Sequence, residues 1–214
     1  MKAKNLNDKH PIIFNLITLG NAGVGKTSII SRYCGLPFES NNLSTIGIEF
    51  SKKVIFKDKK NIYLKLIDTS GQEKFKSLSA SYLRHAEGVL FVFALNNKGS
   101  FEEIKNWVEL FDQEHFGKDN IPKYLVGNKC DLVNDIVVDE DSINNFINNN
   151  KDMIYFRTSA KENINIENVF QDLGEKLYKE YKKSGIYKKP QLKLEEKPKK
   201  KKKECCNSKV KPDI

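Results

Sequence analysis

The sequence predicts an α/β fold: an open, six-stranded, mostly parallel sheet with one antiparallel edge strand and helices on both faces. Apolar stretches alternate with helix-like segments from Ile12 to about Tyr181. Several of these stretches, such as VLFVFAL at 89–95, are apolar at consecutive positions, which is typical of strands that helices cover on both faces. The short polar turn KDKKN joins two extended segments and predicts the antiparallel hairpin. Ligands are therefore expected beyond the carboxyl ends of the strands.

The predicted domain begins with an apolar strand at 12–19, which a glycine-rich turn joins to a helix at about 25–34. Residues 49–56 and 62–68 form the two strands of the hairpin, and a helix at about 77–86 follows. Strand and helix then alternate, as a parallel sheet with helical connections requires. The remaining elements are a strand at 89–95, a helix at 100–116, a strand at 123–127, a helix at 139–150, a strand at 154–158 and a helix at 165–182.

The excess positive charge lies at the end of the chain. The net charge is +9, and residues 182–214 contain 13 lysines and 4 acidic residues, so residues 1–181 are close to neutral. This distribution disfavours nucleic acid as a partner and favours an anionic membrane or an acidic protein. We predict an N-terminal extension at 1–10, a folded domain at 11–182 and a disordered polybasic tail at 183–214. No apolar run approaches the roughly 20 residues of a membrane span, and no signal peptide is evident, so a cytoplasmic location is expected.

The segment GNAGVGKT at 20–27 fits the pattern G-x-x-x-x-G-K-[ST] between a predicted strand and a predicted helix. Its glycines allow successive N–H groups to point at phosphate oxygens, and the helix adds its positive N-terminal end. Lys26 is suited to contact the β- and γ-phosphates, and the Thr27 hydroxyl is suited to ligate Mg²⁺. The predicted phosphate-binding residues are Asn21, Ala22, Gly23, Val24, Gly25, Lys26, Thr27 and Ser28.

The segment DTSGQ at 68–72 ends the second strand of the hairpin. Asp68 lies where a magnesium site beside the phosphate-binding loop needs its carboxylate. Gly71 provides a backbone N–H that can approach a γ-phosphate. Gln72 is suited to orient an attacking water, because its amide can accept from the water and donate to the phosphate.

The segments NKCD at 128–131 and TSAK at 158–161 end two further strands. The Asp131 carboxylate can accept hydrogen bonds from the N1–H and N2–H₂ groups of guanine, whereas adenine would leave this carboxylate unpaired, so ATP is disfavoured. Asn128 is suited to bridge the base and the phosphate-binding loop, and the Ala160 N–H is placed to donate to guanine O6. The predicted base-binding residues are Phe38, Asn128, Lys129, Asp131, Ser159, Ala160 and Lys161.

With these motifs in this order, the chain from about Ile12 to Tyr181 resembles the Ras superfamily of small GTPases, and within it the Rab branch. The segment STIGIEF at 44–50 is similar to the Rab first switch, where Thr45 would meet Mg²⁺ and the γ-phosphate; 72–77 and 81–86 are similar to second-switch segments. The resemblance implies a P-loop G domain that binds GTP or GDP with Mg²⁺, hydrolyses GTP slowly and releases both switches afterwards. It implies metal ligands Thr27, Thr45 and Asp68, and catalytic residues Lys26, Thr45 and Gln72.

The resemblance also implies partners for a monomeric switch in vesicle trafficking. They are an exchange factor, an activating protein, and effectors at a surface of Phe50, Ile67 and Tyr82. No arginine lies in the phosphate-binding loop, so we expect the activating protein to supply the positive charge that hydrolysis needs. Ile67 stands where Rab proteins usually carry Trp, and Ser70 replaces Ala. The loss of a large aromatic contact means that no partner can be inferred from a well-known Rab.

The tail contains Cys205 and Cys206, which resemble the double-cysteine geranylgeranylation site of Rab proteins. Residues 207–214 follow the pair, and the sequence has no C-a-a-X ending. One lipid together with the lysine run 199–203 would meet the two-signal requirement for stable attachment to an endomembrane.

Two alternatives to a hydrolysing switch remain open. The chain could hold GTP or GDP as an interaction module without useful turnover, although Gln72 argues against this. It could instead associate with nucleic acid through its lysine tail, although the neutral body of the chain disfavours that function.

Overall fold

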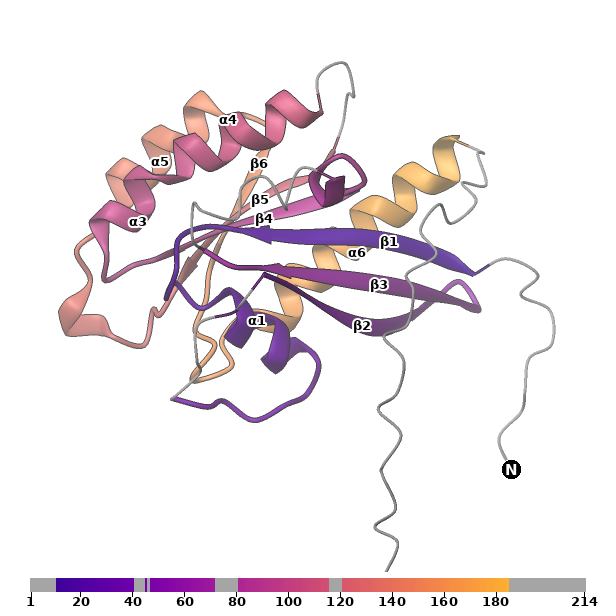
Figure 1. The fold of residues 1–214 in the computed structure, drawn as a ribbon, viewed down its shortest axis with the longest axis horizontal. Coiled ribbons are helices and arrows are strands. Elements are labelled where there is room, and N and C mark those ends of the chain that lie inside the picture. The colour runs from indigo at the N-terminus through magenta and orange to yellow at the C-terminus, as the bar shows by residue number, and fades with distance from the viewer. Residues whose placement is uncertain (1–10, 41–44, 46, 72–80, 116–120, 185–214) are drawn as a thin grey trace, which may run out of the picture.

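A six-stranded sheet with the strand order β2-β3-β1-β4-β5-β6 forms the centre of the computed structural model, which describes residues 11–40, 45, 47–71, 81–115 and 121–184 (Figure 1). Strands β2 and β3 pair antiparallel, and all other neighbouring strands pair parallel. The predicted fold class is therefore confirmed. The strands are β1 (Ile12–Leu19), β2 (Ile48–Lys57), β3 (Lys60–Thr69), β4 (Gly88–Ala94), β5 (Lys123–Asn128) and β6 (Met153–Arg157).

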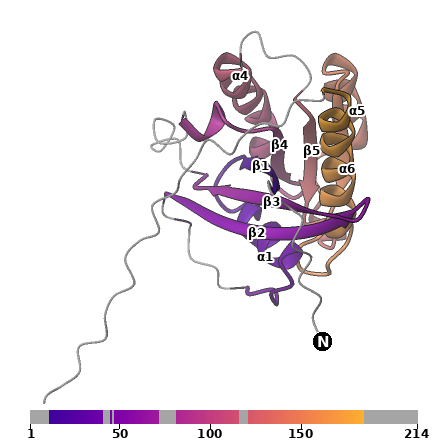
Figure 2. The ribbon, with the colours of Figure 1, turned by 90° about the vertical axis from the view of Figure 1, so that its right-hand side faces the viewer.

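Helices cover the sheet on both faces, and strands β4 and β5 lie between α4 and α6 in Figure 2. Side chains of α1 and α6 pack into one hydrophobic cluster, and side chains of α4 and α5 pack into the other. Strand β4 supplies both clusters: Val92 faces the first, and Phe91 and Phe93 face the second. The consecutive apolar residues of β4 thus result from burial on both faces. The helices are α1 (Lys26–Tyr33), α3 (Lys98–Glu102), α4 (Ile104–Glu114), α5 (Glu140–Asn149) and α6 (Ile166–Ser184), with a 3₁₀ turn η2 at Val133–Asp135.

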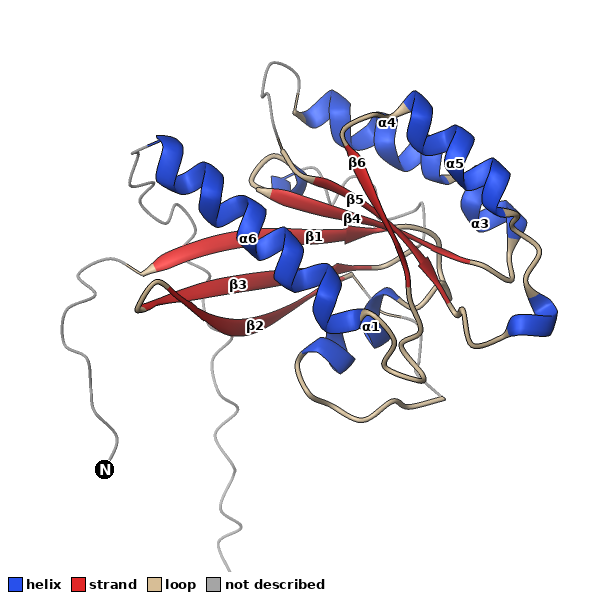
Figure 3. Ribbon diagram, turned by 180° about the vertical axis from the view of Figure 1, so that it is seen from behind, coloured by secondary structure: helices blue, strands red, loops and turns tan. Residues whose placement is uncertain are grey.

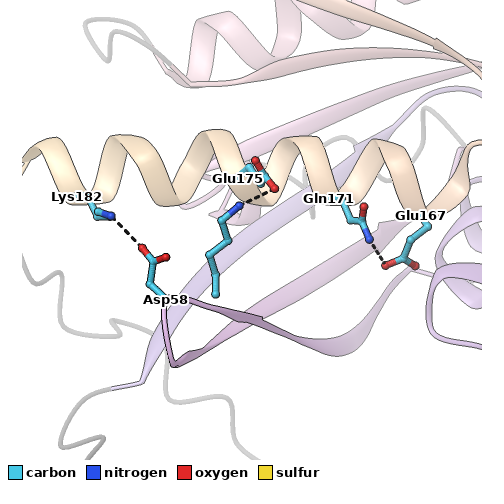
Figure 4. Close-up of polar contacts among 6 residues, drawn as sticks. Asp58, Glu167, Gln171, Glu175 and Lys182 are labelled. Atoms are coloured by element: carbon cyan, nitrogen blue, oxygen red, sulfur yellow. Dashed lines mark hydrogen bonds and ion pairs between the residues drawn. The ribbon is translucent and has the colours of Figure 1, made fainter.

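The β2–β3 hairpin is closed by a tight turn and fixed to the last helix. Asp58 and Lys59 have φ angles of 49° and 62°, the left-handed conformation that two-residue hairpin turns use. Lys57 pairs with Glu175 of α6 at 2.6 Å, and Lys182 of α6 pairs with Asp58 at 2.9 Å. Figure 4 shows α6 lying alongside the hairpin with these contacts between them, next to a Gln171–Glu167 hydrogen bond within α6.

The helix predicted at 100–116 differs from the structure. Two helices, α3 and α4, occupy this stretch and are separated at Glu103. Helix α3 begins earlier than predicted because the Asn97 side chain accepts a hydrogen bond from the Ser100 N–H at 3.0 Å and caps the helix. In the helix predicted at 77–86, residues 81–83 are helical, and residues 77–80 lie outside the described part of the chain.

The described ranges contain no helix that is long and apolar enough to cross a membrane. The predicted extension at 1–10 and most of the predicted tail lie outside these ranges.

Candidate nucleotide-binding site

The predicted phosphate, metal and base motifs meet at the carboxyl ends of the strands. The loop at 20–25 connects β1 to α1, Asp68 lies near the end of β3, and Asn128 ends β5. Figure 3 shows α1 below these strand ends. The parallel arrangement of the strands brings motifs that are far apart in the sequence to one edge of the sheet.

The phosphate-binding loop requires glycine at its junction with α1. Gly25 has a φ angle of 100°, and a Cβ atom there would lie 2.3 Å from Nδ2 of Asn128. The side chain of Asn128 donates in turn to the carbonyl oxygen of Val24 at 2.8 Å. Gly25 is the N-cap of α1 and no side chain caps this end, so the first N–H groups of the helix can bind an anion.

Lys26 is buried beneath this loop. Its ammonium donates to the carbonyl oxygens of Gly20 (2.8 Å) and Asn21 (2.9 Å), which uses two of its three N–H groups. Burial lowers the pKa of Lys26 to about 8, although the nearby Asp68 carboxylate opposes this shift. An adjacent phosphate would stabilise the charged ammonium, so the position fits phosphate binding.

Three side-chain oxygens converge next to the loop. The Thr27 hydroxyl donates to Oδ2 of Asp68 at 2.5 Å and lies 2.7 Å from the Thr45 hydroxyl, which lies 3.5 Å from the same carboxylate oxygen. Burial raises the pKa of Asp68, and the hydrogen bond from Thr27 opposes the rise. Hydroxyl and carboxylate oxygens are the ligands that Mg²⁺ prefers, and a cation here would offset the buried negative charge. The three residues therefore fit a magnesium site.

Asn128 connects the phosphate loop to the base motif. Besides its bond to Val24, its Oδ1 accepts from the Ala160 N–H at 3.1 Å and from the Thr158 hydroxyl at 3.4 Å. The Ser159 hydroxyl donates to Oδ1 of Asp131 at 2.6 Å and orients that carboxylate. The Ala160 N–H, predicted as a donor to guanine O6, thus already has Asn128 as an acceptor.

The model of the Ras family matches residues 15–179. The chain belongs to the Ras family.

Curated relatives place this Ras-family chain in the Rab branch. GTP-binding protein YPT1 of Saccharomyces cerevisiae is 33% identical over 172 residues, which is 80% of this chain and 82% of the yeast protein. Ras-related protein Rab-10 of Diplobatis ommata is 39% identical over 166 residues, 78% of this chain and 82% of that protein. Ras-related protein Rab-3 of Caenorhabditis elegans is 37% identical over 163 residues, 76% of this chain and 73% of that protein. The chain is a Rab-like small GTPase that binds and hydrolyses GTP and acts in vesicle trafficking.

The remaining predicted site residues of this Ras-family chain have contacts of their own or lie outside the described residues. Phe38 lines a cavity of about 110 Å³ with Ser28 and Ser31 of α1. Lys161 is exposed and lies 3.9 Å from Glu162. Gln72, Cys205 and Cys206 lie outside the described residues.

The surface predicted for Rab partners differs in one residue. Phe50 is 39% exposed, and its ring lies 5.4 Å from the ring of Tyr82. Ile67 is only 1% exposed and packs in the core, so it does not belong to this surface as predicted. A small aliphatic side chain at this position fits inside the hydrophobic cluster, against which Tyr82 packs.

Trp107 of α4 contacts the site, although no motif in the sequence marks it as a site residue. Its indole N–H donates to Oδ1 of Asn21 in the phosphate-binding loop at 2.8 Å. The apolar periodicity of α4 predicts that Trp107 is buried, but it carries no information about this polar contact.

Proposed function

We propose that the convergence of Thr27, Thr45 and Asp68 forms the magnesium site of a Rab-type switch. Thr27 and Thr45 would ligate the ion through their hydroxyls, and Asp68 would hold it through its carboxylate. The observation that supports this proposal is the contact of both hydroxyls with one carboxylate oxygen. When bound, Mg²⁺ would neutralise charge on the β- and γ-phosphates of GTP.

Other residues of this chain would bind the phosphates and orient the attacking water. Lys26 and the N–H groups of the loop at 21–28 would bind the phosphates, while Thr45 and the Gly71 N–H hold the γ-phosphate. Gln72 would orient the attacking water. Loss of the γ-phosphate would release Thr45 and Gly71, and with them both switch segments.

Selectivity for guanine would come from the base motif. Asp131, which Ser159 orients at 2.6 Å, would accept from N1–H and N2–H₂ of guanine. The stem of Lys129 would cover one face of the base. Asn128 would link the base to the phosphate loop through its hydrogen bond to the Val24 carbonyl oxygen. An adenine base would leave Asp131 unpaired, which is costly for a desolvated carboxylate.

Stimulated hydrolysis would need a partner. Arg32 bonds to the Leu36 carbonyl oxygen at 3.4 Å, and Arg84 pairs with Glu114 at 3.0 Å. The third arginine, Arg157, pairs with Glu140 at 2.8 Å, so all three arginines have contacts away from the phosphate loop. An activating protein would provide the missing positive charge. Phe50 and Tyr82 would form the centre of the surface that effectors and regulators contact.

The tail at 183–214 would attach the folded domain, residues 11–182, to the cytosolic face of an endomembrane. Its lysines would be attracted to anionic lipids, and a geranylgeranyl group on Cys205 or Cys206 would supply the second signal. The protein would be a monomer and would not bind nucleic acid. An intact mass of the full chain recovered from a eukaryotic cytosol tests the lipid: an unmodified mass would remove the lipid anchor from the proposal.

The magnesium site is tested by the rate of GDP release with Mg²⁺ and after chelation with EDTA. We expect chelation to accelerate release from the wild-type chain, and Thr27→Ala to release GDP quickly in both conditions. Ser31→Ala, on the same helix, is the matched control and should behave as wild type. An EDTA response in Thr27→Ala equal to that of the wild type would contradict the assignment.

A further inference from the structure

The tip of the β2–β3 hairpin exposes apolar side chains. Val54 is 49% exposed and Phe56 is 70% exposed, and both lie on the face of β2 that points away from α6. The opposite face of the strand is used for packing: Ile55 lies against Gly174 of α6. The exposed aromatic ring therefore has no role in the core.

This tip is separate from the switch surface. Phe50 contacts Tyr82, whereas Phe56 is six residues further along β2, a separation of about 20 Å at roughly 3.3 Å per residue. Strand β3 runs from the tip at Lys60 to Asp68 in the metal site, so the tip and the nucleotide lie at opposite ends of the sheet.

Exposed lysines accompany the exposed ring. Lys59 and Lys60 are exposed in and beside the turn, and within the described residues no carboxylate lies within salt-bridge distance of either. The acidic residue of the turn, Asp58, is paired with Lys182 at 2.9 Å. The tip thus presents an aromatic ring next to net positive charge.

The polybasic segment begins at the same place. Helix α6 ends at Ser184, and its last turns are held to the hairpin through Lys182 and Asp58 (Figure 4). The chain that follows contains the lysine run 199–203. The lysine-rich segment therefore leaves the folded domain beside the hairpin tip.

We infer that the hairpin tip, formed by Val54, Phe56, Lys59 and Lys60, is a second contact surface for an anionic membrane. Phe56 enters the interfacial layer, and the two lysines meet anionic headgroups. The membrane is favoured over a protein partner because the tip combines positive charge with the starting point of the lysine-rich segment. The inference rests on the proposed attachment of the tail. Its consequence is an orientation in which the nucleotide and the switch surface point away from the bilayer.

A tryptophan reporter tests this orientation. The full chain carrying Phe56→Trp and an added C-terminal oligohistidine tag is held on vesicles of phosphatidylcholine and phosphatidylserine that contain nickel-chelating and spin-labelled lipids. Val133→Trp is the matched control, because Val133 is also 70% exposed but lies in η2, beyond the carboxyl end of β5. The native Trp107 is buried and contributes a constant background.

We expect the spin label to quench Trp at position 56 and to leave Trp at position 133 unquenched. Adding Lys59→Gln and Lys60→Gln should weaken the contact by about fivefold for each lysine. The same changes at Lys98 and Lys105, which are exposed on α3 and α4, should have no effect.

Three results would overturn the inference: no quenching at position 56, equal quenching at both positions, or a concentration-dependent emission shift at position 56 without vesicles. The last result would mean that a second copy of the chain covers the tip. Binding of the untagged, geranylgeranylated chain to the same vesicles tests the tail separately. If the untagged chain fails to bind while the tagged chain is quenched at position 56, the tail loses its membrane role and the hairpin surface stands.

Discussion

The indole N–H of Trp107 donates a hydrogen bond to Oδ1 of Asn21 at 2.8 Å, which ties α4 to the phosphate-binding loop. The backbone carbonyl of Asn21 accepts from the Lys26 ammonium at 2.9 Å. Asn21 thus accepts one hydrogen bond from Trp107 through its side chain and another, through its backbone, from the lysine that we propose binds phosphate. The position of α4 and the geometry of the loop are therefore coupled.

Replacing Trp107 with Phe should accelerate GDP release by about 2- to 10-fold, because a hydrogen bond worth about 0.5–1.5 kcal/mol no longer orients Asn21. Asn21→Ala should have a similar effect, and the double variant should add little, because both changes remove the same bond. Stopped-flow measurement of GDP release checks this. Phe111→Leu, a core change on the same helix, is the control for lost packing, and an equal acceleration there would contradict the coupling.

Adding a methyl group at Gly71 should weaken GTP binding relative to GDP binding. A Cβ atom there would lie 2.2 Å from the backbone nitrogen of Ala22, so residue 71 must move away from the loop. The loss of one hydrogen bond to a charged phosphate predicts a fall of about 10- to 150-fold in relative affinity for a GTP analogue. Competition binding of the analogue and GDP to Gly71→Ala measures this ratio.

Gly99→Ala is the matched control for Gly71→Ala, because its Cβ would lie 3.5 Å from the nearest atom, an ordinary contact. An unchanged ratio of GTP-analogue to GDP affinity in Gly71→Ala would show that Gly71 does not contact the γ-phosphate.

The sequence allowed the strands to be predicted to within two residues at each end. Central strands buried on both faces are continuous apolar runs, and the polar KDKKN turn marks the hairpin. Strand β4 is an example: all its residues are buried. The division between α3 and α4 could not be predicted. No Gly or Pro lies within three residues of Glu103, and the apolar residues Phe101, Ile104 and Trp107 keep one helical period across the break. The structure separates the helices where the local sequence contains no stop signal.

The GNAGVGKT, DTSGQ, NKCD and TSAK segments could be located because each follows a recognisable strand. Contacts between residues that are far apart in the sequence could not be predicted. Trp107 and Asn21 are 86 positions apart, and periodicity predicts burial but not a polar partner. The family resemblance predicts Ile67 at the partner surface, but its aliphatic side chain packs in the hydrophobic cluster and is 1% exposed.

Asp131→Asn should change the base that the chain prefers. The amide keeps the acceptor for the Ser159 hydroxyl but can donate to the C2 carbonyl of xanthine and cannot accept two hydrogen bonds from guanine. GDP binding should weaken by about 100-fold, roughly 3 kcal/mol, and xanthosine diphosphate should bind more tightly than GDP. Competition binding of the two nucleotides measures this preference. Asp135→Asn, an exposed change in η2, should leave the preference for GDP intact.

The contact between the hairpin and α6 should appear in the titration of Asp58. The hydrogen bond and charge of Lys182 hold the pKa of Asp58 below its ordinary value. A lowered carboxyl pKa means that the stabilising contact is complete above the ordinary Asp pKa of about 3.9 and is lost as the pH falls through the lowered value. Lys182→Gln should therefore raise the Asp58 pKa, as measured by NMR. Lys183→Gln is the control, because Lys183 pairs with Glu180 instead, and an equal rise there would contradict the assignment.

The most direct test of the switch assignment is single-turnover conversion of bound GTP to GDP by the full chain in Mg²⁺, compared with Gln72→Leu. We predict slow, complete hydrolysis by the wild-type chain. Gln72→Leu should retain its GTP and hydrolyse it at least about 100-fold more slowly, because the attacking water is no longer oriented. Equal rates in the two chains would contradict the role of Gln72. Bound GTP that the wild-type chain never hydrolyses would instead make the chain a nucleotide-holding interaction module.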